Sequence, residues 1–256
     1  MDSILFRKNI RNGLFRGQTS GECKNFIQTN VVILDKKHAY DFLVFCQRNS
    51  KPCPIIEVLD PGVFEAKITT PNSDIRFDVP KYRVYTNGKL EEELHQIDSY
   101  WNKNLVTFLL GCSFSFEHEL VESGFYLPYY NSSRTVPMFN TNIPTTPSGN
   151  FDGNMVVTLR WIDESRVDEV IAISSKYTDS HGSPVHIGDP EKIGIKDITQ
   201  PDYGNQWIND DKNYVPVFWA CGVTPQNIAL SSKIDFMITH SPGHMFITDL
   251  STRNKN

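Results

Sequence analysis

The sequence lacks the features that mark membrane, secreted and nucleic-acid-binding proteins. No apolar run approaches the roughly 18 to 20 residues that cross a bilayer, and residues 1–13 lack the apolar core of a signal peptide. A formal net charge of −5 without a long basic run argues against a nucleic-acid surface. We therefore expect a soluble protein of the cytoplasm, with an organellar matrix left open, whose partner is a small-molecule carboxylate or amino acid and neither nucleic acid nor membrane.

Cysteine is present without the pairing that would cross-link a fold. The five cysteines are an odd number and none forms a Cys-x-x-Cys pair, so neither a complete disulfide framework nor a four-cysteine zinc site is indicated. We expect free thiols, no cofactor and no metal ligands, with a divalent metal left open. The 256 residues, 39% of them hydrophobic, suffice for one large domain or two modest ones, and a homo-oligomer stays open.

What the chain does have is a pair of similar stretches, 105–117 (LVTFLLGCSFSFE) and 215–226 (VPVFWACGVTPQ). Each runs from an unbroken apolar segment into a small residue and a cysteine, Cys112 or Cys221, and then into a helix-like segment. Unbroken apolar runs of this length are typical of strands buried on both faces, as in parallel sheets. We predict that these two strand ends form the centre of the protein.

The residues after each cysteine predict a helix N-terminus. If Ser113 or Ser115 caps a helix over 116–123 and Thr224 caps one that begins at Pro225, each cysteine lies beside a helix N-terminus. The free N–H groups there favour anions, thiolates included. The backbone after the cysteines, at Ser113 and Gly222, is then a candidate site for carboxylate oxygens. The alternative is that both cysteines are small core residues without chemistry.

Hydrophobic periodicity outlines the rest of the fold. It predicts helices at 35–49, 91–101 and 163–177, and Asn87-Gly88 predicts a hairpin turn. We expect an α/β fold with a mixed, largely parallel central sheet, helices on its faces and a smaller α+β second lobe. Further strands are predicted at 31–34, 55–59, 74–78, 82–85, 155–159 and 234–239. The expected division is 1–124 and 200–256 for the main domain and 125–199 for the second lobe.

Polar residues in loops and at strand ends supply further candidates. His240 and His244 follow the last predicted strand, and they meet the two cysteines if these strands are neighbours in a parallel sheet. Glu57 lies within an apolar run, where an acid costs free energy unless it is paired, so it is a catalytic candidate. The remaining binding candidates, each with an ordinary loop or surface role as the alternative, are Thr19, Ser20, Gln28, Asn30, Arg76, Arg83, His186 and Asp189. The last two share a Gly/Pro-rich loop with His181, which suits a metal or acid/base cluster as well as a hydrogen-bonded loop.

Several stretches, in this order over nearly the whole chain, resemble the D-glutamate cyclase family, whose members are also described as hydro-lyases. The matching stretches are GQTSG (17–21), IQTN (27–30), DFLVFCQRNSKPCPIIEVLDPG (41–62), DIRFDVPKYRVYTNG (74–88), LLGCSFSFE (109–117), VPMFNTN (136–142), HGSPVHIGDP (181–190), VPVFWACGVTPQ (215–226) and ITHSPGHMFITD (238–249).

The resemblance implies an α/β fold with a smaller second lobe and a lyase that, in characterised members, converts D-glutamate to 5-oxo-D-proline with loss of water. Asn140 stands where the family's VPMYRTN motif has arginine, and Thr145 replaces the usual cysteine shortly after it. The missing arginine removes a candidate carboxylate clamp and leaves the exact acid open. A hydro-lyase for another small carboxylic or amino acid and a non-catalytic small-acid binding protein are the alternatives.

Cyclisation of glutamate requires a base, an anion-stabilising group and an acid in one pocket. We predict that Cys112 or Cys221, or His244, moves the proton. Glu57 is a further catalytic candidate, and the polar loop at 17–30 orients the ligand.

Overall fold

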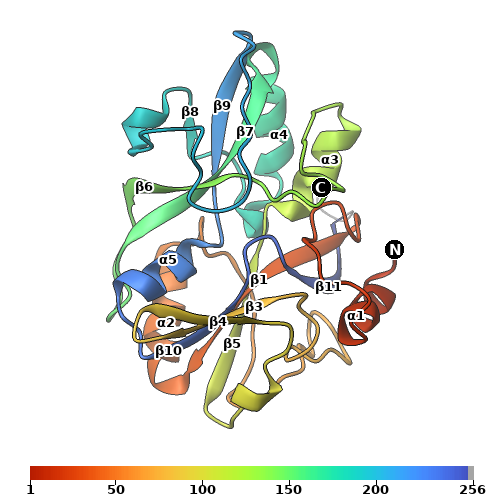
Figure 1. Cartoon of the computed structure of the whole chain (residues 1–256), viewed down its shortest axis with the longest axis vertical. Helices are drawn as coiled ribbons and strands as arrows, with labels where there is room; N and C mark the ends of the chain where they lie inside the picture. The colour runs from red at the N-terminus through yellow and green to blue at the C-terminus, as the bar shows by residue number, and fades with distance from the viewer. Residues whose placement is uncertain (253–256) are drawn as a thin grey trace.

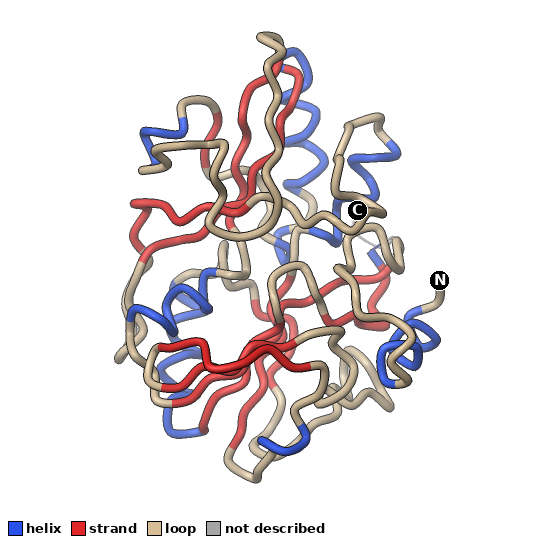
Figure 2. The backbone as a smooth tube through the Cα atoms, in the orientation of Figure 1, coloured by secondary structure: helices blue, strands red, loops and turns tan. Residues whose placement is uncertain are grey.

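The computed structural model describes residues 1–252, in which the strands form two sheets (Figures 1 and 2). The seven-stranded sheet has the order β2-β5-β1-β10-β3-β4, with β11 paired to β1, and the four-stranded sheet has the order β6-β7-β9-β8. The first set of strands comprises β1 (Phe26–Asp35), β2 (Ile55–Val58), β3 (Tyr82–Thr86), β4 (Lys89–Leu94), β5 (Leu105–Gly111), β10 (Phe236–His240) and β11 (Phe246–Ser251). The second comprises β6 (Met138–Pro144), β7 (Asn154–Asp163), β8 (His186–Ile187) and β9 (Tyr214–Ala220). The α-helices are α1 (Ser3–Arg11), α2 (Lys36–Arg48), α3 (Phe114–Glu122), α4 (Val167–Ser175) and α5 (Thr224–Ser231).

The predicted largely parallel central sheet is wrong, because the strand pairs of both sheets are antiparallel throughout the described chain. The reason lies in how β5 is covered. Its residues Val106, Phe108 and Leu110 join one core cluster, and Leu105 and Leu109 join another on the opposite face. A strand that is buried on both faces is apolar at every position whatever the direction of its neighbours, so the pattern does not report strand direction.

Each face of the seven-stranded sheet is covered in a different way. On one face, α2 packs against β1 and β5, and Ile228 of α5 joins Phe42 and Phe45 of α2 in the core there. The cap of α2 is as predicted, since Asp35 accepts a hydrogen bond from the backbone N–H of Lys37 at 3.0 Å. The opposite face is covered by the long connection at 59–81, which has no regular strand or helix (Figure 2).

The predicted hairpin is confirmed, and two neighbouring predictions are wrong. Asn87 and Gly88 join β3 to β4, and both have positive φ, +49° and +74°, as a two-residue hairpin turn requires. The segment 91–101, predicted as a helix, instead continues β4 and then forms one short 3-10 turn. Its acidic, exposed residues suit a helix surface as well as a sheet edge. The segment 74–78, predicted as a strand, forms turns.

The four-stranded sheet lies in the upper half of Figure 1 and is covered on one face by α3 and α4. Because β9 pairs with β7 over seven residues, the strand that leads to Cys221 belongs to this sheet. The second lobe expected at 125–199 contributes β6, β7 and β8 to it. The division of the chain into domains stays a prediction.

Two crossings connect the sheets. The chain leaves the seven-stranded sheet at the end of β5 and enters α3, which packs in the core of the four-stranded sheet. It leaves the four-stranded sheet at the end of β9 and enters α5, which packs in the core of the seven-stranded sheet. Cys112 and Cys221 lie at these two crossings.

Candidate active site

A small cavity lies where the two crossings meet. Its volume is about 20 Å³, which is room for one water molecule. None of its lining residues within the described chain is Asp, Glu, Lys or Arg. The lining residues are Asn30, Cys112, Ser113, Phe114, Val136, Met138, Thr158, His181, Cys221, Val223, His240, Gly243 and Met245.

The prediction that the two cysteines lie on neighbouring strands of one sheet is wrong, since β5 and β9 belong to different sheets. They nevertheless line the same cavity, because the sheets face each other at the two crossings. The backbone N–H of Val223 donates to Cys221 Sγ at 3.5 Å, and that of Phe114 donates to the sulfur of Cys112. Both N–H groups belong to helix N-termini, at α5 and α3.

Burial decides the ionisation of these thiols. It raises the pKa of Cys221 to about 11 and raises that of Cys112 well above its usual range, while the backbone N–H donors act against it. Since desolvation outweighs the helix termini, both residues are neutral thiols at neutral pH. The expectation that the helix termini favour thiolates is therefore not met at these buried cysteines.

The capping side chains differ from the prediction. Ser113 occupies the N-cap position of α3 but makes no capping hydrogen bond; it lines the cavity, and its hydroxyl accepts from Arg160 instead. Thr224 is the first residue of α5 rather than its cap. Its hydroxyl donates to the carbonyl of Cys221 at 2.7 Å and accepts from the N–H of Val156 at 3.0 Å. Thr224 thus fixes the crossing to β7.

Two imidazole rings line the cavity. The N–H of Val31 donates to Nδ1 of His240 at 3.1 Å, and Nδ1 of His181 lies 2.8 Å from the carbonyl oxygen of Lys51. Nε2 of His240 is buried without a hydrogen-bond partner in residues 1–252. Burial lowers the pKa of His240 to about 3 and that of His181 to about 4, so both rings are neutral at physiological pH.

Asn30 and Gly222 meet at the wall of the cavity. A Cβ atom on Gly222 would lie 2.0 Å from Asn30 Nδ2, so only glycine permits this approach. Nδ2 of Asn30 donates to the carbonyl of Gly111 at 2.8 Å, so the amide oxygen Oδ1 points away from that carbonyl. Asn30 is therefore a polar lining residue, and Gly222 makes room for it.

A fully buried ion pair lies behind the cavity wall. Arg160 on β7 and Glu117 on α3 are 2.6 Å apart between Nη2 and Oε1, and neither side chain is exposed. The guanidinium also donates to Ser113 Oγ and to Thr158 Oγ1, both at 3.0 Å. Since Ser113 and Thr158 both line the cavity, Arg160 orients polar side chains of the site from behind its wall. The sequence reasoning missed this pair, although polar residues at alternate positions of β7 are a signal for it.

The polar loop at 17–20 supports the site from outside the cavity. Ser20 Oγ donates to Glu117 Oε2 at 2.6 Å, and the N–H of Thr19 donates to the carbonyl of Gly243 at 2.8 Å. Gln28 Nε2 donates to the carbonyl of Thr19 at 3.0 Å. The loop therefore holds Glu117 and the turn at 241–244, and none of the three side chains lines the cavity.

Two open grooves adjoin the turn at 241–244. One, of about 440 Å³, is lined by His244 and Ser20, among others, and the other, of about 350 Å³, by Arg83 and Ser241. The predicted catalytic His244 therefore faces an outer groove, where burial lowers its pKa. Arg83 donates to Glu93 at 2.8 Å. Its charge is already paired there.

Two other predicted residues are engaged locally, away from the cavity. Glu57 accepts hydrogen bonds from the N–H and the hydroxyl of Thr69 at 2.9 and 2.6 Å, which satisfies the buried carboxylate. Arg76 donates twice to Asp74, at 2.8 and 2.7 Å. Both side chains fix the connection at 59–81.

The predicted cluster in the loop 180–190 does not converge. His181 lines the cavity. His186 belongs to β8 of the four-stranded sheet, and its Nε2 lies 2.7 Å from the carbonyl oxygen of Asp189. The Asp189 side chain accepts from the N–H of Glu191 at 3.0 Å and begins a 3-10 turn. Within residues 1–252, no group of three or more His, Cys, Asp or Glu side chains is placed to hold a metal ion.

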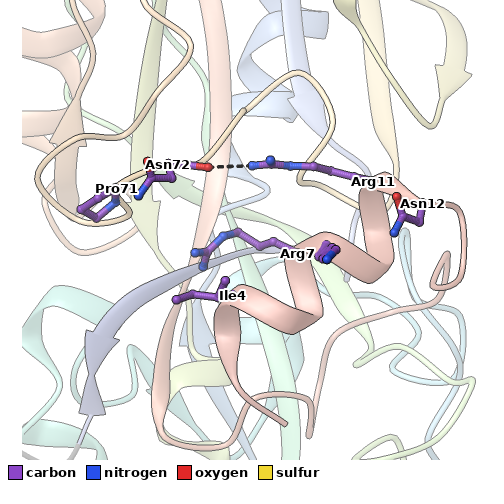
Figure 3. Close-up of a pocket in the computed structure, with 7 residues that line it drawn as sticks. Ile4, Arg7, Arg11, Asn12, Pro71 and Asn72 are labelled. Carbon is purple, nitrogen blue, oxygen red and sulfur yellow. Dashed lines mark hydrogen bonds between the residues drawn. The ribbon is translucent and has the colours of Figure 1, made fainter.

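A separate pocket of about 430 Å³ lies between α1 and the turn at 71–72 (Figure 3). Arg11 donates to the carbonyl of Asn72 at 3.0 Å, as the dashed line shows, and pairs with Asp78. Arg7 pairs with Asp249 at 2.9 Å. Since both guanidinium groups already have carboxylate partners, this pocket is a weaker candidate than the cavity between the sheets. No helix in the described chain is long and apolar enough to span a membrane.

Comparison with known proteins identifies the family. The D-glutamate cyclase family model matches residues 106–249, and a protein of Oceanobacillus iheyensis is 51% identical over 95% of this chain and 96% of its own length. The chain belongs to the D-glutamate cyclase family. Family members from Natranaerobius thermophilus and Geobacillus kaustophilus are 49% and 48% identical, over 95% and 98% of this chain and 93% and 95% of their own lengths. All three relatives carry the name "Putative hydro-lyase".

The region that matches the D-glutamate cyclase family model spans both crossings, and with them Cys112, Cys221, Arg160 and His240. Among solved structures, a nitrogen repressor-like protein of Methanococcus jannaschii has a TM-score of 0.40 and 10% identity, covering 92% of this chain and 91% of that one. This likeness is too low to support any inference about the family.

Proposed function

We propose that this family member is a lyase that converts D-glutamate to 5-oxo-D-proline with loss of water, in the cavity between the sheets. The observation that carries the proposal, beside the family, is the uncharged lining of that cavity. Free glutamate holds an ammonium group and a γ-carboxylate, and neither reacts with the other. Burial disfavours charged groups, so this lining favours proton transfer that yields a neutral amine and a neutral γ-carboxylic acid.

The cavity also offers groups for the charges that remain. The N-termini of α3 and α5 direct the positive ends of two helix dipoles toward it, which suits the α-carboxylate. Ser113 Oγ accepts from Arg160, so its own proton is available to a ligand oxygen. A hydroxyl held in this way stabilises the oxyanion that forms when the amine attacks the γ-carboxyl carbon.

Glutamate binding requires the cavity to widen, because it has room for one water molecule only. The turn at 241–244 is the element that separates it from the outer grooves, since Gly243 lines the cavity while Ser241 and His244 line the grooves. This turn is held by the hydrogen bonds from Thr19 to Gly243. Its displacement would join the cavity to the grooves and admit the substrate.

The proposal is tested by incubating the purified full chain with D-glutamate and detecting 5-oxoproline by NMR, beside L-glutamate and a panel of small hydroxy and amino acids. We expect turnover of D-glutamate. The Ser113→Ala variant should lose about 10² to 10³ in kcat. Ser175→Ala is the matched control, because that hydroxyl donates to the carbonyl of Ala172 at 3.0 Å on the exposed side of α4, and it should keep full activity.

Other outcomes select other functions. Water loss from another acid without turnover of D-glutamate would indicate a different hydro-lyase. Saturable D-glutamate binding in calorimetry without any product would indicate a binding protein. Equal activity of Ser113→Ala and Ser175→Ala would remove Ser113 from the chemistry.

A further inference from the structure

We infer that His181 is the proton acceptor of this site and His240 its fixed hydrogen-bond donor, two roles that rest on the proposed cyclisation. Their rings are held by backbone groups in opposite tautomers. The cavity therefore presents one basic nitrogen and one N–H to the same small space.

The tautomer of His181 follows from its partner. A carbonyl oxygen only accepts, so Nδ1 of His181, 2.8 Å from the carbonyl of Lys51, carries the proton. Nε2 is left with its lone pair. A histidine whose Nδ1–H is held by an acceptor while Nε2 is open is the arrangement of a general base.

The tautomer of His240 is the reverse. Its Nδ1 lies 3.1 Å from the backbone nitrogen of Val31 and 3.4 Å from the carbonyl oxygen of the same residue. The nearer group is an N–H, which only donates and would meet a second hydrogen if Nδ1 were protonated, so Nδ1 holds the lone pair and Nε2 carries the proton. This buried N–H has no acceptor in the described chain. A buried donor without a partner costs about 1 to 3 kcal/mol, so its presence at the wall of a cavity indicates that a ligand oxygen completes it.

The position of His181 is built into the backbone. A Cβ on Gly111 would lie 1.6 Å from the carbonyl oxygen of Asp179, so the segment before His181 packs directly on the end of β5. His181 itself has φ +79°, a left-handed conformation that is rare for a residue other than glycine. Backbone strain of this kind is retained mainly at functional sites.

The thiols are poorer candidates for proton transfer. Their raised pKa values leave them protonated, whereas His181 is neutral and has an open lone pair.

In the reaction, the ammonium group of glutamate gives up two protons and its nitrogen forms a bond to the γ-carboxyl carbon with the freed electron pair. One carboxyl oxygen takes the C–O bonding pair and both protons and leaves as water.

His181 Nε2 accepts each proton from nitrogen and returns it to that oxygen, so the enzyme ends unchanged. His240 Nε2–H donates to the other carboxyl oxygen, which carries negative charge in the tetrahedral intermediate and becomes the ring carbonyl. The sum is glutamate to 5-oxoproline plus water, without any oxidant or further reactant.

Two measurements test the assignment. The first is ¹⁵N NMR of the wild-type chain, with His181→Gln and His240→Gln used to assign the signals. We expect protonated Nδ1 in His181 and protonated Nε2 in His240. The opposite tautomer in either ring overturns the corresponding role, whatever the enzyme does with D-glutamate.

The second measurement compares glutamine and leucine at both positions. Glutamine places an NH₂ donor where Nε2–H of histidine lies but cannot take up a proton. We therefore expect His240→Gln to stay within about tenfold of wild type in kcat, and His240→Leu to lose about 10² to 10³. At position 181, both the glutamine and the leucine variant should have kcat lowered by a factor of about 10² to 10⁴. His95→Gln, whose ring bonds to the carbonyl of Pro80 outside the cavity, is the control for activity.

The two proposals fail in different ways. If His181→Gln keeps its activity, His181 is not the proton acceptor. If His240→Gln folds by circular dichroism but loses as much activity as His240→Leu, His240 is not the hydrogen-bond donor. In both cases the proposed cyclisation stands. A wild-type chain that has the expected tautomers but does not turn over D-glutamate refutes the cyclisation, and with it both roles.

Discussion

The buried pair of Arg160 and Glu117 allows a sharp test of the fold around the site. Replacing Glu117 by glutamine keeps the shape of the side chain and removes its charge. The guanidinium then stays fully buried without a counter-ion, and its hydrogen bonds to Ser113 and Thr158 do not replace the lost charge. Unit charges about 4 Å apart at an effective dielectric constant of about 20 attract by roughly 4 kcal/mol.

Breaking one partner of a buried pair typically costs about 3 to 5 kcal/mol, which for a chain of this size lowers Tm by roughly 6 to 20 °C. We expect Glu117→Gln to show this loss in thermal and urea unfolding followed by circular dichroism. The control is Glu169→Gln, which breaks an exposed pair of similar length with Arg166, 2.8 Å, and should cost at most about 1 kcal/mol. Arg160→Met combined with Glu117→Leu should cost less than the sum of the two single changes.

The result that refutes this reasoning is a Glu117→Gln variant no less stable than Glu169→Gln. The two groups would then be hydrated rather than sealed between α3 and β7. Arg160 would then not hold the hydroxyl of Ser113 in a fixed position.

Two further predictions concern the cavity wall. Gly222→Ala should lose at least about 1 to 3 kcal/mol of unfolding free energy in urea, because its Cβ would overlap Asn30. The control is Gly17→Ala, whose Cβ would make an ordinary contact with the Phe15 ring at 3.5 Å and which should stay within about 0.5 kcal/mol of wild type. Equal losses in the two variants would contradict the close approach of Gly222 and Asn30. Acidification should also destabilise the fold. Because the pKa values of His181 and His240 are lowered to about 4 and about 3, the unfolded chain binds more protons than the folded one below about pH 6.5. The unfolding free energy therefore decreases by about 1.4 kcal/mol for each histidine as the pH is lowered by one unit. Urea unfolding between about pH 6 and 5 should therefore show a shallower slope in His181→Gln than in wild type, and identical slopes would show that the ring is not buried neutral.

The sequence by itself determined several local elements and the family. Asp35 and the apolar spacing of Phe42 and Phe45 predict α2, and Asn87-Gly88 predicts the hairpin, because caps and turns depend on residues next to each other in the chain. The apolar runs that end at Cys112 and Cys221 are also local features. Family motifs are sequence patterns, so they too were recognisable before the structure.

Strand direction and the composition of the site were decided by tertiary structure. Burial on both faces makes β5 apolar whether its neighbours are parallel or antiparallel, so the strand was predicted correctly and the parallel sheet was wrong. The cysteines were expected to meet along one sheet but meet between two, through crossings that no local pattern reports. The tautomer of His181 depends on a carbonyl 130 residues away, and Arg160 is paired with a carboxylate 43 residues away. Such pairings arise only when the chain is folded, because distance along the chain does not limit contact in space.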